Sequence, residues 1–237
     1  MIAYPAIDLR SGRAVQLVGG VPDRERISLD DPLAAAAHWV SLGFRALHVV
    51  DLDGALDTGD NRAVVQRIIT TSRVPVQVGG GIRTDEAVAD WLNTGATRVM
   101  AGTRAVEDAE WLRRTSRAWP DRLLVAADSR DGAVLTRGWT TASGVRIESF
   151  LESLGGLPLA GVLVTDVGRE GRLAGIDAGR FAELVHASPL PLIAAGGITS
   201  LDDLRALERA GAAGAVLGMA LYSGAVDARA VAREFAS

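Results

Sequence analysis

Two aspartates, Asp8 and Asp128, are the residues of this sequence best suited to acid-base chemistry. Each one ends a run of apolar residues that is typical of a β-strand, and the two positions lie 120 residues apart in a chain of 237. A pair of carboxyl groups in unequal surroundings can act as general base and general acid without a metal or cofactor. The alternative is that each carboxylate only caps neighbouring backbone at the end of its strand.

A glycine-rich stretch occurs twice, as residues 75–83 and again as residues 191–199. In both copies an apolar run meets consecutive glycines and is followed by a good helix N-cap, Thr84 or Ser200. Glycine lets the backbone approach a ligand closely, and the N–H groups at a helix start favour an anion. The pattern predicts two phosphate sites, whereas tight turns without any ligand are the alternative interpretation.

The duplication extends along the whole chain. The next strand of each copy ends in glycine, Gly102 or Gly218, and Asp51 matches Asp166 after an earlier strand of each half. Two halves of four strand-helix units predict an α/β fold, a (β/α)8 TIM barrel built from two similar half-barrels. Two phosphate sites on opposite sides of one mouth suit a long ligand that is phosphorylated at both ends.

The expected strands are apolar runs followed by loop signals, and they favour a single barrel domain over residues 1–237. They are Ala3–Asp8, Ala46–Asp51, Val74–Gly79, Arg98–Ala101, Leu123–Asp128, Gly161–Thr165, Leu192–Ala195 and Gly214–Leu217. The strand order would place Asp8 and Asp128 opposite each other. The longest irregular stretches all follow strands, on the face where such barrels carry their active sites: Gly19–Ser28, Gly54–Asn61, Ser129–Gly144 and Gly168–Asp177.

Composition excludes several kinds of chemistry. The sequence has no cysteine, and all 25 basic residues are arginine, so thiolate catalysis and lysine Schiff bases are impossible. A net charge of −4 without a basic tract argues against nucleic-acid or membrane partners. We expect a cytoplasmic monomer that binds one small molecule and uses neither a cofactor nor a metal.

Several motifs, in order and over essentially the whole chain, resemble the ProFAR isomerase family of histidine biosynthesis. That family is a duplicated half-barrel that isomerises a bis-phosphorylated ribotide, an aminoaldose, to an aminoketose by an Amadori rearrangement. The resemblance therefore implies the kind of ligand that the two glycine stretches predict. The motifs are Pro5–Gly12, Leu47–Ala55, Val78–Arg83, Arg98–Thr103, Gly138-Trp139, Val164–Val167 and Ala195–Ile198.

The resemblance also implies roles for the reacting groups. Asp8 would be the base that takes the C2′ proton, and it must stay ionised. Asp128 would be the acid that protonates the ring oxygen, so its pKa should be raised, and Thr165 would hold Asp128 and the opened sugar. Asp51 would either support the mouth or simply anchor the following loop, and His48 is expected to pack in the barrel wall.

The resemblance assigns two phosphate cradles. The first cradle comprises Gly80, Gly81, Gly102 and Thr103, with Arg83 neutralising charge, and the second cradle comprises Gly171, Gly196, Gly197 and Gly218. Trp139 would stack on the imidazole ring of the substrate, or else be plain packing.

The sequence departs from the family pattern at a few positions, which puts affinity in doubt more than reaction type. The family often has arginine at Gln16, usually reads Asp-Gly-Thr where this chain has Glu170-Gly171-Arg172, and often has a basic residue at Met219. Arg137 before the Gly-Trp pair suggests a weak side activity on phosphoribosyl anthranilate. The alternatives are the related cyclase, which normally carries a lysine after its first strand, and a non-catalytic sugar-phosphate sensor.

Overall fold

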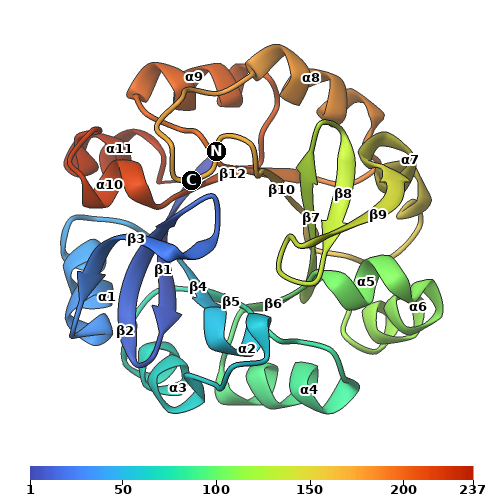
Figure 1. Ribbon diagram of the computed structural model, residues 1–237, viewed down its shortest axis with the longest axis horizontal. Coiled ribbons are helices and arrows are strands. Elements are labelled where there is room, and N and C mark those ends of the chain that lie inside the picture. Colours follow the sequence, from blue (N-terminus) through green and yellow to red (C-terminus); the bar gives the residue numbers. More distant parts are fainter. Residues whose placement is uncertain (237) are drawn as a thin grey trace.

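The chain forms a closed barrel of parallel strands inside a ring of helices, in a computed structural model that describes residues 1–236 (Figure 1). The barrel strands, in ring order, are β1 (Ile2–Arg10), β4 (Leu47–Asp51), β5 (Val76–Gly79), β6 (Arg98–Ala101), β7 (Leu123–Arg130), β10 (Gly161–Asp166), β11 (Leu192–Ala195) and β12 (Gly214–Leu217), and β12 pairs with β1 to close the ring. This architecture confirms the predicted TIM barrel.

Helices cover the outside of the barrel between successive strands. The covering helices are α1 (Pro32–Ser41), α3 (Arg62–Thr71), α4 (Asp85–Thr94), α6 (Ala109–Ala118), α7 (Ile147–Ser153), α8 (Ala178–Ala187), α9 (Leu201–Arg209) and α11 (Ala228–Glu234). Three short helices follow β4, β6 and β12 directly: α2 (Leu52–Leu56), α5 (Thr103–Glu107) and α10 (Met219–Tyr222). The expected N-caps Thr84 and Ser200 accept a backbone hydrogen bond at a helix start, and Asp31 and Asp177 do the same for α1 and α8.

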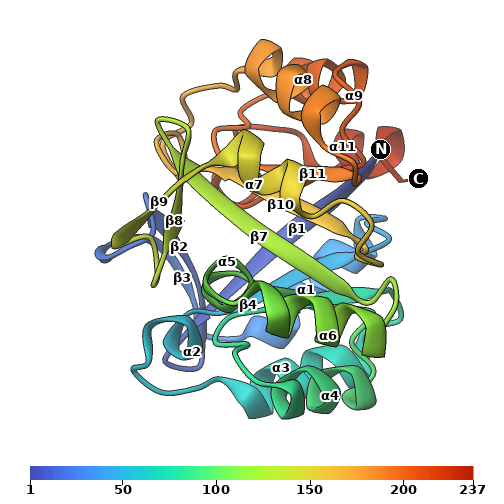
Figure 2. The ribbon, with the colours of Figure 1, turned by 90° about the vertical axis from the view of Figure 1, so that its right-hand side faces the viewer.

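Two β-hairpins extend the barrel where the sequence suggested irregular loops. The strands β2 (Arg13–Val18) and β3 (Val21–Leu29) follow β1, and β8 (Ala133–Thr136) and β9 (Thr141–Arg146) follow β7. Figure 2 shows both hairpins projecting from the same end of the barrel. The expectation of irregular chain over residues 19–28 and 129–144 is therefore wrong for most of those positions.

Tight turns connect the hairpins to the barrel strands and join β2 to β3. Ser11-Gly12, Gly19-Gly20 and Asp131-Gly132 each join antiparallel strands with positive φ at both residues, which is the geometry of a tight two-residue hairpin turn. Ser11-Gly12 and Asp131-Gly132 also lie 120 positions apart, so the half-barrel duplication includes the hairpins.

The interior of the barrel is filled by side chains that alternate along the strands. Tyr4 and Ala6 on β1, and Leu124 and Ala126 on β7, belong to one buried cluster inside the ring. Since side chains of a strand alternate between its faces, Asp8 and Asp128 continue these inward rows at the next positions. β1 and β7 stand four strands apart in the eight-stranded ring, and therefore opposite each other, as predicted.

Candidate active site

A cavity of about 240 Å³ lies at the carboxyl ends of the barrel strands and brings the predicted site residues together. Among the residues that line it are all those assigned to catalysis or ligand binding from the sequence: Asp8, Gly80, Gly81, Arg83, Gly102, Thr103, Asp128, Trp139, Thr165, Gly171, Gly196, Gly197 and Gly218. They come from both halves of the chain, so the barrel fold is what assembles them. Within residues 1–236 no cluster of histidines and carboxylates has a geometry that could hold a metal ion.

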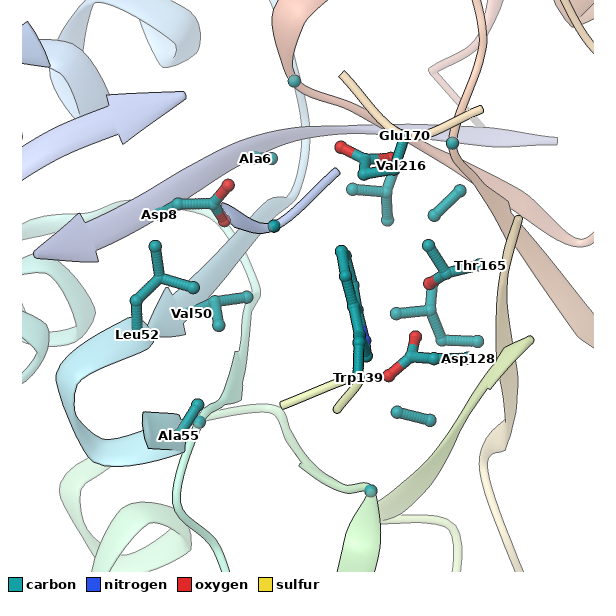
Figure 3. A pocket seen from close by; sticks show the side chains of 18 of the residues that line it. Ala6, Asp8, Val50, Leu52, Ala55, Asp128, Trp139, Thr165, Glu170 and Val216 are labelled. Atoms are coloured by element: carbon teal, nitrogen blue, oxygen red, sulfur yellow. The ribbon is translucent and has the colours of Figure 1, made fainter. Parts of the chain in front are cut away.

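The two aspartates face each other across this cavity with the Trp139 indole between them (Figure 3). Burial raises the pKa of Asp8 from 3.8 to about 7. The pKa of Asp128 is also raised by burial, although hydrogen bonds with Thr165 and Trp139 partly oppose the rise. The expected rise for Asp128 is confirmed, but Asp8 is not held firmly ionised at neutral pH, because burial acts on it and no hydrogen bond from the described residues 1–236 offsets that burial.

Thr165 is placed beside Asp128 by strand pairing. The two residues are direct partners in the parallel register of β7 and β10, and Thr165 is 4% exposed. Their side chains therefore point into the barrel at the same height, where the threonine hydroxyl reaches the carboxyl group. The predicted contact between Thr165 and Asp128 is present.

The two glycine cradles have nearly the same backbone geometry. Gly80 and Gly196 have φ values of 100° and 91°. A Cβ atom on Gly80 would stand 2.1 Å from the backbone oxygen of Asp51, and a Cβ atom on Gly196 would stand 2.7 Å from that of Asp166. A Cβ atom on Gly81 would come similarly close to the carbonyl oxygen of Gly54, and a Cβ atom on Gly197 would come similarly close to that of Gly175. Glycine is therefore required at each of these positions, because another backbone segment lies too close for a side chain. The same glycines line the cavity, so a role in tight turns and a role in ligand binding are compatible.

The helix starts at the cradles are not the ones that the sequence suggested. Thr84 and Ser200 cap α4 and α9 with their own side chains, and each accepts one of the backbone N–H groups at the helix start, from Ala87 or Asp203. Instead, Gly102 and Gly218 precede α5 and α10 with no side-chain cap, and both glycines line the cavity. The exposed N–H groups at the cradles therefore belong to the short helices.

Arg83 lines the first cradle but already has partners. Its Nη1 donates to Oδ1 of Asp57 at 2.6 Å, and its guanidinium also reaches the carbonyl oxygens of Gly54 and Ala55. Arg169 makes similar contacts to Ala174 and Gly175 near the second cradle. Each arginine therefore holds the loop carbonyl on which a cradle glycine packs, and its positive charge stands close to the cradle.

Trp139 is carried by the turn between β8 and β9 and reaches the mouth from above. Three consecutive residues of this turn, Arg137, Gly138 and Trp139, have positive φ values of 55°, 62° and 69°. The indole packs on Gly20 of the other hairpin, where a Cβ atom would stand 2.4 Å from the ring. The Arg137 side chain points elsewhere, since its Nε lies 3.2 Å from Oε1 of Glu107 and it does not line the cavity.

Two polar groups of the cavity were not recognised as site residues from the sequence. His48 is 3% exposed and its Nδ1 lies 2.7 Å from Nε2 of Gln77, while burial lowers its pKa to about 4. Since an amide nitrogen only donates, the neutral ring carries its proton on Nε2. His48 does pack in the barrel wall, as predicted, but it also lines the cavity.

The second group is Glu170, which the sequence indicated only as a departure from the family pattern. It lines the cavity, and burial together with Asp8, Asp128 and Asp166 raises its pKa to about 8. A signal was available in principle, because Glu170 precedes Gly171, which was already assigned to a cradle.

Asp51 is an anchor for the loop that follows it, which was one of its two interpretations. Its carboxylate accepts hydrogen bonds from Gly54, from the Asn61 backbone at 2.7 Å and from the Asn61 amide at 2.7 Å. Asp53 accepts from the same amide and from the backbone of Ser11. These contacts tie the first hairpin to the β4 loop, and Asp51 does not line the cavity.

Comparisons with known proteins agree with this site. The family model described as histidine biosynthesis protein matches residues 2–227. A protein of Gemmatimonas aurantiaca is 49% identical over 235 residues, 99% of either chain, and one of Myxococcus xanthus is 49% identical over the full length of both. A Methanothrix thermoacetophila protein is 45% identical and covers 95% of this chain and 94% of its own.

All three relatives carry one name, 1-(5-phosphoribosyl)-5-((5-phosphoribosylamino)methylideneamino) imidazole-4-carboxamide isomerase, which is the chemical name of ProFAR isomerase. The similarity covers the barrel strands, both cradles and both aspartates. The chain therefore belongs to the histidine biosynthesis protein family, among its ProFAR isomerases.

Proposed function

We propose that this chain converts the bis-phosphorylated ProFAR aminoaldose to its aminoketose by an Amadori rearrangement. The observation that carries the proposal is a pair of carboxyl groups on opposite strands, Asp8 and Asp128, between two matched glycine cradles. Two cradles at the ends of one cavity suit a ligand with a phosphate at each end. The chain would act as a single barrel domain and as a monomer, because one chain supplies every residue of the cavity. We place this activity in the cytoplasm as part of the same proposal.

The first step would be ring opening by Asp128. Its carboxyl proton passes to the ring oxygen while the nitrogen lone pair forms the C1′=N bond and the C1′–O bond breaks, which leaves an open-chain protonated imine. The raised pKa of Asp128 favours the protonated form that this step needs, and the bond to Thr165 fixes the direction of the carboxyl group. Thr165 also borders the place where the opened sugar would lie.

The second step would be proton removal by Asp8 from the other side of the sugar. Its carboxylate takes the C2′ proton, the electrons of the C–H bond form an enolamine, and tautomerisation gives the ketose. A base whose pKa lies at about 7 is largely ionised at slightly alkaline pH and still accepts a proton readily. We therefore expect the rate to fall as pH drops below about 7 and Asp8 becomes protonated.

The cradles and Trp139 would position the substrate for both steps. The first cradle would hold one phosphate and the second cradle the other, through backbone N–H groups. Trp139, which stands between the two aspartates, would stack on the imidazole ring. No step requires a cofactor, and neither nucleic acid nor a membrane is proposed as a partner. Within residues 1–236 no helix is long and apolar enough to span a bilayer.

The side activity on phosphoribosyl anthranilate is proposed to be poor or absent. Arg137, which would have paired with the carboxylate of that substrate, is engaged with Glu107 outside the cavity. Gln16, at the position where the family often has arginine, is 2% exposed and cannot supply the missing charge.

Steady-state turnover with each of the two aminoaldoses tests these proposals. We expect turnover of ProFAR, little or none of phosphoribosyl anthranilate, and loss of the ProFAR activity in Asp128→Asn. Absence of turnover with intact binding would favour the sensor. Efficient turnover of both substrates that survives Arg137→Ala would contradict the account of substrate range.

A further inference from the structure

A second cavity lies outside the barrel, between the outer face of β10 and β11 and helix α8, which stands between α7 and α9 in the ring (Figure 1). Its volume of about 420 Å³ is within the range of small-molecule sites. The β7–β8 turn, Asp131-Gly132, forms part of its lining. Its side chains take no part in the proposed reaction, although Gly196 borders both cavities. The apolar part of the lining comprises Ile147, Val164, Phe181, Leu184, Ala194 and Leu207.

The β7–β8 turn has the same form as its counterpart in the first half of the chain. Asp131 and Gly132 have φ values of 52° and 76°, and Ser11 and Gly12 have 50° and 77°. Each pair joins two antiparallel strands. Turns of the same conformation direct their backbone N–H groups in the same way, so the hydrogen bonds of the two turns can be compared directly.

In the first half, side chains of the following loop accept both turn N–H groups. The Ser11 N–H donates to Oδ2 of Asp53 at 2.6 Å, and the Gly12 N–H donates to Oδ1 of Asn61 at 2.8 Å. The Asn61 amide nitrogen in turn donates to Asp51 and to Asp53. A carboxylate and an amide oxygen from the chain itself therefore occupy the space beside this turn.

The second half lacks the carboxylate of this arrangement. Asp166 is the counterpart of Asp51, so the residue two positions later, Gly168, stands where the first half has Asp53. Glycine has no side chain that could reach the turn. The carboxylate acceptor is therefore missing at the turn that lines the second cavity.

The other acceptor of the first half is used elsewhere in the second half. Asp177 stands where the first half has Asn61, at the spacing of 116 that separates the two glycine stretches. Its carboxylate caps α8 by accepting from the Arg180 N–H at 2.9 Å. Within residues 1–236, the N–H groups of Asp131 and Gly132 have no hydrogen-bond acceptor. Two donors at the cavity are therefore free to bind a ligand.

The charges beside these two donors favour an anion. The guanidinium of Arg146 lies over the turn, since a Cβ atom on Gly132 would overlap with it, and its Nη1 donates to the Asp131 carbonyl oxygen at 3.0 Å. Asp166 is already paired with Arg169, whose Nε lies 3.2 Å from Oδ2. Asp131 is exposed, so water and salt screen its charge. The formal charge of the lining is balanced by three arginines and three aspartates: Arg146, Arg169, Arg180, Asp131, Asp166 and Asp177.

We propose that this cavity binds a small organic carboxylate with an apolar body. The ligand carboxylate accepts from the N–H groups of Asp131 and Gly132, as the Asp53 and Asn61 oxygens do for the turn of the first half. The guanidinium of Arg146 adds positive charge beside it, and the apolar body lies against the side chains between α8 and the barrel. This site is separate from the reacting groups, so the inference does not depend on the proposed function.

Titration of the wild-type protein with isovalerate, followed by amide NMR signals at constant ionic strength, tests the proposal. A ligand of this size should bind with a Kd on the order of 1–10 mM. The amide signals of Asp131 and Gly132 should move downfield and reach saturation. The first-half turn is the internal control, because Ser11 and Gly12 already have their acceptors and their signals should stay constant.

Two comparisons test the charge and the position. Isovaleramide has the shape of isovalerate without its charge, and it should bind at least about tenfold more weakly, because hydrogen bonds to an ionised acceptor are stronger. The double variant Gly168→Asp with Asp177→Asn restores the acceptors of the first half, and asparagine still caps a helix well. This variant should bind isovalerate at least about tenfold more weakly than wild type, because its own side chains would occupy the turn.

The outcomes decide the proposal whether or not ProFAR is turned over. Saturable shifts at Asp131 and Gly132 that the double variant removes would support it. Constant signals for both residues at about 100 mM isovalerate, tenfold above the weakest expected Kd, would overturn it. Shifts confined to the active-site cavity, at Gly102 or Gly218, would also overturn it, because the probe would then occupy a phosphate cradle. Equal affinity for isovalerate and isovaleramide would show that the site does not select a carboxylate.

Discussion

Replacing Asp8 by asparagine is expected to make the protein more stable while removing its activity. Burial holds the pKa of Asp8 at about 7 in the folded protein, against 3.8 in the unfolded chain. Between these pH values the folded protein binds a proton that the unfolded chain does not. Stability therefore decreases as pH rises from about 4 to 7 and stays reduced above that range.

The size of the effect follows from the shift in pKa. About three pKa units correspond to about 4 kcal/mol at pH 8, where Asp8 is ionised in both states. The carboxyl group keeps some contact with the open cavity, so about half of this, about 2 kcal/mol, is a better expectation. At pH 5 the folded-state charge is already neutralised, and the gain from asparagine should fall to about 1 kcal/mol.

Urea unfolding at pH 5 and pH 8 would measure these differences, with kcat determined on the same preparations. Asn has the size of Asp but cannot accept the C2′ proton, so kcat should drop by about 10² or more. The control is Asp30→Asn, which changes an exposed carboxylate in the loop before α1 and should alter neither quantity. If Asp8→Asn were less stable than wild type at pH 8, the carboxylate would be a structural cap and the argument from burial would be refuted.

Two further predictions use glycines of the mouth. Gly20→Ala would bring a Cβ atom to 2.4 Å from the Trp139 ring, so the indole should be displaced and kcat/KM should fall by about tenfold. The matched control is Gly156→Ala, because Gly156 has a similar φ of 76° and its Cβ position has no atom within 4 Å. Gly81→Ala and Gly197→Ala should each raise KM and cost about 1–3 kcal/mol in unfolding free energy, because their Cβ atoms would stand 2.6 and 2.4 Å from a carbonyl oxygen at positive φ. Equal KM in these variants and wild type would leave the glycines with a role in the turns only.

The barrel strands could be predicted from sequence because strands that are buried on both faces consist of continuous runs of apolar residues. The hairpins were missed although Asp131-Gly132 is a strong turn signal, since their strands are partly exposed and interrupted by charged residues such as those of β3. Local patterns also placed Asp8 and Asp128 correctly, because the duplication fixes both their strand ends and their facing directions.

The remaining features depend on residues that are distant in sequence. The pKa of Glu170 is raised first by burial in the assembled mouth and then by three carboxyl groups from three strands. Trp139 meets Gly20 only because two hairpins extend over the same mouth. Arg83 pairs with Asp57, a residue 26 positions earlier that ends α2 in a left-handed conformation. No pattern within a single segment of the chain encodes these distances.

The matched cradles have a consequence for how a ligand finds its direction. Gly102 has φ and ψ of −100° and −98°, and Gly218 has −106° and −100°, so the two ends of the cavity offer the same backbone frame. A backbone frame that is the same at both ends does not distinguish one phosphate from the other. The direction of the ligand must be set by side chains without a counterpart at the other end, namely Trp139 between the two aspartates and Glu170 beside Gly196. These two side chains favour one of the two directions in which a bis-phosphate could lie in the cavity.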